Sequence, residues 1–264
     1  MKPIVRIILA LAAIAACLFL WLVGDRVADS QRHEVTCKAV DAVVADSLER
    51  RFVSPDDIQD WMADYGTWTG LRLDSLDLCR VERIIDGKSA VRKSQAWLTD
   101  DGVLHVSVTQ REPVVRFQGP SGGFYADREG YLFPLQSRFT ARVPVVDGAL
   151  PVKLEKNFKG QPATEKEREW VRSVLTLVKY LADRQEWGEL VGQINVLKGG
   201  DLVLIPREGT ERFLFGTPTD IDAKFGRIQK YYEGVAPTQE TPYNSVDVRF
   251  DNQIVCRRQN NKRQ

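Results

Sequence analysis

The segment VRKSQAWLTDDGVLHVSVTQREPVVRF, residues 91–117, carries the clearest fold signal in this chain. Two strand-like runs, Val91–Leu98 and Val103–Thr109, flank the turn-forming residues Thr99–Gly102, an arrangement typical of a β-hairpin. In the second run every other residue is leucine or valine, which places these side chains on one face of a strand. Pro113 then interrupts a continuing ladder. The segment therefore predicts a hairpin with one buried face that ends near residue 113.

Two helices and one strand are predicted before the hairpin. Ser54–Asp57 offers a capping serine, a proline suited to the first helical position and two aspartates that complement the helix dipole. Asp74–Ser75 can start a second helix, which Asp86–Gly87 ends. Glu34–Val40 alternates like a half-buried strand. The order strand, helix, helix, strand, strand predicts a small α+β unit over residues 33–113.

Residues 114–256 are predicted to form a second, mainly antiparallel β domain with two helices. Glycine-containing turns separate short apolar runs along its length, which is typical of successive short strands. Thr164 and Glu167 have the spacing of a capping box at the start of one helix. Thr217–Pro218 favours the start of the other helix, which contains Lys224.

The end of the chain is predicted to be a strand followed by a polar tail. The strand covers Ser245–Phe250 and continues, after Asp251–Asn252, through Gln253–Cys256. Residues 257–264 are basic and polar, and we expect them to be disordered. Near the start of the chain, by contrast, the stretch Ala42–Arg51 has a helix-like composition.

The N-terminal region contains an uncharged apolar run, Ile7–Val23. As a helix this run is roughly 26 Å long, enough to span the hydrocarbon core of a membrane. Trp21 lies near its far end, where interfacial aromatic residues are common. A cleaved signal peptide and a lipoprotein processed at Cys17 are the alternatives, although no small-residue cleavage site follows the run. We expect residues 1–24 to be a short cytoplasmic tip and a transmembrane helix.

Charge composition narrows the choice of partner. Lys and Arg total 37 and Asp and Glu total 36, giving a net charge of +1, so no basic surface for nucleic acid is indicated.

Basic residues flank the apolar run on both sides. Lys2 and Arg6 precede it, and Arg26, Arg32 and Lys38 follow it. These flanking charges therefore do not determine which end of the run faces the cytoplasm.

No motif indicates catalysis, a cofactor, a metal ion or a small-molecule substrate. The four cysteines form no C-x-x-C pair, which argues against a zinc or thioredoxin-like site. A Cys37–Cys79 disulfide and unpaired buried thiols both remain open. His105 is predicted to be a surface strand residue rather than a general base. A site assembled from distant residues would leave no local trace, so a membrane-bound enzyme remains an alternative class.

Several segments together resemble one protein family. They are Trp68–Leu71, Leu76–Glu82, Gln110–Phe117, Tyr125–Leu135 and Tyr243–Phe250. In this order, after an N-terminal apolar run, they are similar to the POTRA domain and β domain of FtsQ/DivIB cell division proteins. Ser94 stands where the family favours alanine.

The resemblance implies a non-catalytic scaffold of the divisome that acts in septum formation. It also implies an anchor in the inner membrane, with the N-terminus in the cytoplasm and most of the chain in the periplasm. It implies FtsB and FtsL as partners, bound by addition of a strand to the last strand of the β domain, and other division proteins at the POTRA domain. The implied partner-binding residues are Arg249, Phe250, Asp251, Asn252, Gln253 and Ile254. A POTRA-containing module for protein transport or envelope assembly is the alternative function. The resemblance also suggests that Phe250→Ala, or a proline at Asn252, weakens FtsB binding without unfolding.

Overall fold

The computed structural model divides into two compact units, Met1–Gln110 and Arg111–Gln264, which are described separately. The residues that the structure describes are 14–21, 35–46, 51–120, 122–153, 155, 157–241 and 243–258. Its overall class is mixed α+β, with a three-stranded sheet in the first unit and a nine-stranded sheet in the second.

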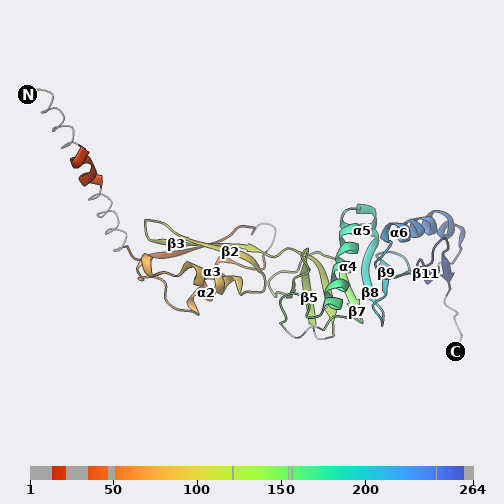
Figure 1. Cartoon of the computed structure of the whole chain (residues 1–264). Coiled ribbons are helices and arrows are strands. Elements are labelled where there is room, and N and C mark those ends of the chain that lie inside the picture. Colours follow the sequence, from red (N-terminus) through yellow and green to blue (C-terminus); the bar gives the residue numbers. More distant parts are fainter. Residues whose placement is uncertain are drawn as a thin grey trace, which may run out of the picture. The chain divides into compact units, whose positions relative to one another are not determined.

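The first unit is a small sheet with two α-helices on one side (Figure 1). Its elements are β1 (Ala39–Val44), α2 (Pro55–Ala63), the 3-10 turn η1 (Leu73–Ser75), α3 (Leu78–Asp86), β2 (Val91–Leu98) and β3 (Val103–Gln110). The strand order is β1-β3-β2, with β1 parallel and β2 antiparallel to β3. Ile58 and Met62 of α2 and Val81 and Ile85 of α3 are buried. This arrangement confirms the predicted order of strand, helix, helix, strand, strand.

The first strand differs from its predicted position. It covers Ala39–Val44 instead of Glu34–Val40, and Thr36 forms only an isolated bridge with Arg72. The helix-like reading of Ala42–Arg51 is wrong for its first residues, which belong to this strand. Short apolar stretches fit helix and strand equally well. Pairing of β1 with β3 decides the outcome here, since it buries Ala42 and Val44.

The two helix starts in this unit give one confirmation and one correction. Ser54 caps α2 as predicted: its hydroxyl accepts from Asp57 N at 3.2 Å, and Asp57 Oδ2 accepts from Ser54 N at 2.8 Å. The second helix begins at Leu78 rather than at Asp74–Ser75. Asp77 is its cap, because its side chain accepts from Arg80 N at 2.9 Å.

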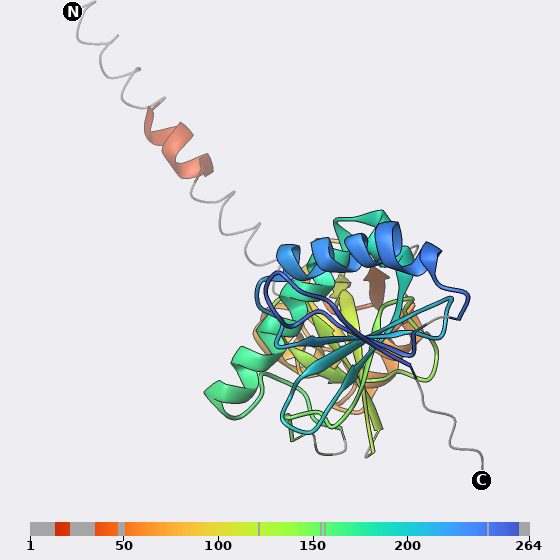
Figure 2. The ribbon, with the colours of Figure 1, turned by 90° about the vertical axis from the view of Figure 1, so that its right-hand side faces the viewer.

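The second unit contains nine strands and three α-helices among the residues that the structure describes (Figure 2). Its strands are β4 (Pro113–Gly119), β5 (Gly122–Asp127), β6 (Leu132–Pro134), β7 (Val145–Gly148), β8 (Val191–Val196), β9 (Leu202–Pro206), β10 (Arg212–Gly216), β11 (Ser245–Asp247) and β12 (Val255–Arg257). Its α-helices are α4 (Glu165–Ala182), α5 (Gln185–Leu190) and α6 (Ile221–Lys230). The π-helix η2 (Tyr231–Val235) and the 3-10 helix η3 (Ala236–Thr238) follow α6. The sequence predicted α4 and α6, although α6 begins at Ile221 rather than at Thr217–Pro218, and α5 was not anticipated.

The nine strands form one sheet in the order β12-β11-β10-β9-β8-β7-β4-β5-β6. Pairs β10–β11, β7–β8 and β4–β7 are parallel, and the other five pairs are antiparallel. One row of buried apolar side chains crosses six strands: Phe117, Val146, Ile194, Leu204, Phe213 and Val246. Helices α4 and α6 bury their apolar side chains in the same core, so both cover this face of the sheet.

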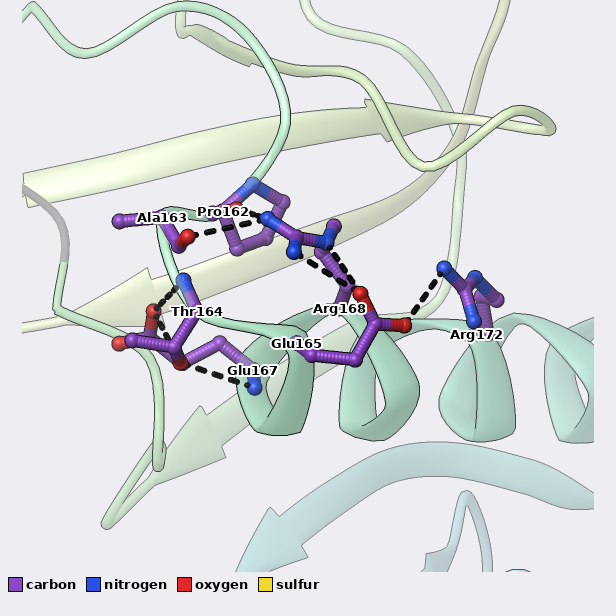
Figure 3. A network of polar contacts seen from close by, with 7 residues as sticks. All are labelled: Pro162, Ala163, Thr164, Glu165, Glu167, Arg168 and Arg172. Atoms are coloured by element: carbon purple, nitrogen blue, oxygen red, sulfur yellow. Dashed lines mark hydrogen bonds and ion pairs between the residues drawn. The ribbon is translucent and has the colours of Figure 1, made fainter.

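Helix α4 begins with the predicted capping box (Figure 3). Thr164 Oγ1 accepts from Glu167 N at 3.3 Å, and Glu167 Oε2 accepts from Thr164 N at 3.0 Å. Backbone N–H groups of Lys153 and Thr164 donate to the Glu167 carboxylate and lower its pKa. The box therefore fixes the start of the helix and also joins it to the loop before it.

The predicted transmembrane helix Ile7–Val23 lies partly outside the described residues. Residues 14–21 are helical, and Phe19, Leu20 and Trp21 are exposed. Within the described part of the chain, no helix has both the length and the apolar character needed to cross a membrane. Residues 259–264 of the predicted tail also lie outside the described part, whereas Arg257 belongs to β12.

Candidate functional site

The two ends of the nine-stranded sheet differ in how far they are covered. At one end, β6 is bridged by Gly160: Leu132 N donates to Gly160 O, and Gly160 N donates to Leu132 O, both at 2.9 Å. At the other end, β12 pairs with β11 and has no second strand beside it among the described residues. An end strand of this kind presents backbone groups to which an extended partner segment can add.

The predicted partner residues, Arg249–Ile254, form the connection between β11 and β12 rather than a strand. The strand predicted over Ser245–Phe250 ends at Asp247, because Asp247 Oδ1 accepts from Arg249 N at 3.1 Å and turns the backbone. Strand pairing resumes only at Val255. The structure thus brings all six residues together beside the end strand, and their role in binding stays a prediction.

Arg249 is held by neighbouring carboxylates. Its Nε and Nη2 donate to the two oxygens of Asp247 at 2.9 and 2.7 Å, and its Nη1 lies 3.5 Å from Asp201 Oδ2. Burial raises the pKa of Asp247, but the hydrogen bonds and charge of Arg249 outweigh this effect and leave the pKa below its usual value. Arg249 therefore stabilises the connection itself, in addition to any contact with a partner.

Arg227 of α6 fixes the other side of this connection and was missed from the sequence. Its Nε donates to Val248 O at 2.9 Å, and its Nη1 lies 3.5 Å from Asp251 Oδ1. Gly216 is also needed here: its φ is +73°, and an added Cβ would lie 2.9 Å from Cδ of Arg249. The sequence signal was the Phe215–Gly216 pair before α6, but its partner in the C-terminal connection became visible only in three dimensions.

Phe250 and Asn252 differ in how a substitution would affect the local backbone. Phe250 is 46% exposed, and the guanidinium of Arg249 lies 5.6 Å from the centre of its ring. Asn252 has a φ of +58°, whereas proline holds φ near −65°. A proline at Asn252 would distort the turn, so a loss of binding in that variant would not distinguish a lost contact from a changed backbone. The expectation that this proline leaves the domain folded stays a prediction. Phe250→Ala removes exposed surface and remains a usable probe.

His105 occupies a hydrogen-bonded position on the strand β3, as predicted for a surface strand residue. Its Nδ1 lies 3.0 Å from Asp41 Oδ2, and its Nε2 lies 3.2 Å from Thr99 Oγ1. The Trp97 ring stacks on the imidazole, with ring centres 5.2 Å apart. Thr99 also hydrogen-bonds Asp101, so its hydroxyl is already engaged. The row Asp41, His105, Trp97 follows the strand register and ties the three strands together.

The cysteines are free at all four positions, which lie within the described part of the chain. Cys37 is buried, Cys79 is exposed and Cys256 is intermediate. The Cys37–Cys79 disulfide that the sequence left open is therefore not formed. No group of three or more potential metal ligands is found among the described residues.

Each of the two units matches a known family model. A POTRA-like domain model matches residues 35–109, and a model described as FtsQ/DivIB, C-terminal related, matches residues 112–257. No curated protein matches the chain. The fold and the matches define a class of protein, a POTRA-like unit followed by an FtsQ/DivIB-related β domain. Both are domain types of non-catalytic scaffolds.

The second match covers more than half of the chain, and this chain belongs to the FtsQ/DivIB family. Membership indicates a role in cell division, with other division proteins as partners. It accounts for the segments that suggested the resemblance, including Gln110–Phe117 and Tyr125–Leu135, which contribute strands β4, β5 and β6.

Proposed function

We propose that this protein is a membrane-anchored, non-catalytic scaffold of the division machinery that binds FtsB and FtsL by strand addition at β12. The observation that carries the proposal is that, among the residues that the structure describes, β12 ends the sheet with a neighbouring strand on one side only. Backbone hydrogen bonds along such an edge supply affinity, and the adjacent side chains supply specificity. Arg249–Ile254, directly before this strand, are the proposed contact residues, with Phe250 as the exposed apolar one.

The proposed location is the inner membrane, with one N-terminal helix, a cytoplasmic N-terminus and both folded units in the periplasm. Its support is the uncharged run Ile7–Val23, which has the length of a membrane span. Mass spectrometry of the mature N-terminus tests this. An intact N-terminus is expected, whereas cleavage after the apolar run, or a lipid on Cys17, would overturn the proposed anchor.

Phe250→Ala tests the proposed binding site. The variant should weaken capture of the FtsB–FtsL pair by roughly tenfold, the loss expected when about 1.4 kcal/mol of interface contact is removed. Its circular dichroism spectrum should match that of the unchanged protein, because the ring is 46% exposed. Leu197→Ala is the matched control, since Leu197 is 43% exposed in the same unit but lies in the β8–β9 turn.

The possible outcomes distinguish a wrong binding site from a wrong function. Equal capture by the Phe250→Ala and Leu197→Ala variants would move the interface away from the β11–β12 connection. Absence of any capture by the unchanged protein would contradict FtsB and FtsL as partners. Depletion of the protein in its source bacterium should produce filaments, and normal septation after depletion would overturn the division role itself.

A further inference from the structure

The edge strand β2 of the POTRA-like unit has outward-facing backbone amides. β2 ends the three-stranded sheet, with β3 on its inner side. Thr99 N, just past the strand, donates to Val103 O at 3.1 Å, so its amide faces β3. Amides alternate in direction along an antiparallel strand. Those of Gln95 and Trp97 therefore face β3, and those of Ser94 and Ala96 point away from it.

The outward amides of Ser94 and Ala96 are already bound by carboxylates of α3. Asp86 Oδ1 accepts from Ser94 N at 2.7 Å, and Glu82 Oε1 accepts from Ala96 N at 2.9 Å. Glu82 and Asp86 are one helical turn apart, about 6 Å along the axis, and Ser94 and Ala96 are about 7 Å apart along the strand. The helix thus presents two acceptors at the spacing of the two donors.

We propose that Glu82 and Asp86 seal the edge of β2 against strand addition. An added strand would need the Ser94 and Ala96 amides, and unprotected amides on an edge strand recruit other chains. The seal is a property of the POTRA-like unit and does not depend on the division role. It protects the part of the β2 edge that lies beside α3.

The Ser94 side chain also contributes to the seal. The side chain is buried, with 3% of the residue exposed. Its hydroxyl lies 2.7 Å from the same oxygen of Asp86 and 3.2 Å from the main-chain oxygen of Glu82. These contacts hold the Asp86 carboxylate against the strand, so the acceptor stays in place.

Amide hydrogen exchange in the full chain, purified in detergent, tests the seal. In the double variant Glu82→Ala/Asp86→Ala, exchange at Ser94 and Ala96 should become about tenfold faster, because each amide loses one hydrogen bond to a charged group. Exchange at Gln95 and Trp97 should not change, since their partners lie on β3. The matched control, Glu82→Gln/Asp86→Asn, keeps an acceptor oxygen at both positions and should keep the protection.

Self-association is the second measurement, because an opened edge can pair with the same edge of another copy. Sedimentation should show concentration-dependent association for the alanine pair, and none for the unchanged protein or the amide pair. If Ser94 and Ala96 keep their protection, the carboxylates do not seal the edge. Lost protection without association would show that the body of α3 excludes the strand, and would overturn the proposal.

If the alanine pair unfolds the unit, amide exchange at Gln95 and Trp97 will accelerate as much as exchange at Ser94 and Ala96. A single substitution is the test in that case. Glu82→Ala alone leaves Asp86 and Ser94 in place and should accelerate exchange at Ala96 only. Glu82→Gln is its control. Unchanged exchange at Ala96 in the single variant would contradict the seal.

Discussion

Arg111 and Asp127 explain, at the scale of single residues, the most distinctive sequence segments of the chain. Arg111 Nη1 donates to Asp127 Oδ2 at 2.8 Å, and the guanidinium lies 3.4 Å from the centre of the Tyr131 ring. The Arg111 and Asp127 side chains are 11% and 8% exposed. Asp127 Oδ1 accepts from Tyr131 N at 2.9 Å, which closes the turn after β5. The two segments are therefore one structural unit separated in sequence.

Arg111→Ala should destabilise the second unit by about 3–5 kcal/mol, because it leaves the Asp127 charge buried without its partner. Arg128→Ala is the control: Arg128 lies 3.6 Å from Glu112, its side chain is 77% exposed, and such pairs contribute about 0–1 kcal/mol. Urea unfolding of both variants measures the difference. Equal small losses would show that the ion pair is not a main support of the unit.

Asp247 should make the second unit sensitive to acid. Burial opposes its charge, but the hydrogen bonds and charge of Arg249 lower its pKa below the usual value of 3.8. A lowered pKa means that the stabilisation is complete above the unfolded-state pKa and is lost as the pH falls through the folded-state pKa. The free energy of unfolding should therefore fall more steeply below about pH 4 in the unchanged protein than in Asp247→Asn. Identical slopes would contradict this assignment.

At the scale of elements, the caps at Ser54 and Thr164 were predictable, whereas the start of α3 and several strand ends were not. Thr164 and Glu167 lie three residues apart, so their mutual hydrogen bonds follow from the sequence alone. The end of β11 depends on Asp247, whose side chain turns back to the amide of Arg249. An aspartate inside an alternating apolar pattern gives no sign of this turn. The predicted partner segment was consequently placed in a strand, although it forms a connection.

Thr164→Ala should destabilise the second unit by about 1 kcal/mol, the usual loss for a helix N-cap. The hydroxyl of Thr164 accepts from Glu167 N, and the helix that it caps contributes Val171 and Val174 to the core. Thermal unfolding measures the loss. Thr164→Ser keeps the acceptor and is the control, so an equal loss in both variants would mean that the cap bond is not responsible.

At the scale of the whole molecule, each unit has its own core. Ile58 and Val174 are fully buried, the first beneath the three-stranded sheet and the second beneath the nine-stranded sheet. Ile58→Ala should destabilise the first unit by about 2–5 kcal/mol, and Val174→Ala should lower the stability of the second. Calorimetry should show that each substitution lowers the temperature of a different transition. A single transition that both variants shift equally would show that the two units unfold together.

The sequence by itself determined the features that depend on neighbours along the chain. These are the hairpin of β2 and β3, the caps at Ser54 and Thr164, and the order of elements that led to the family. Local hydrogen bonds and side-chain alternation are enough to specify them.

Only the tertiary structure decided the features that depend on partners distant in sequence. The position of β1 follows from the pairing of Ala39–Val44 with β3. Among the described residues, β12 is an end strand because β11 is the one strand that pairs with it. The amides of Ser94 and Ala96 on the outer side of β2 are bound because α3 brings two carboxylates to them. A sheet edge exists only after the strands have been ordered, so no local pattern in the sequence could reveal which edge is open.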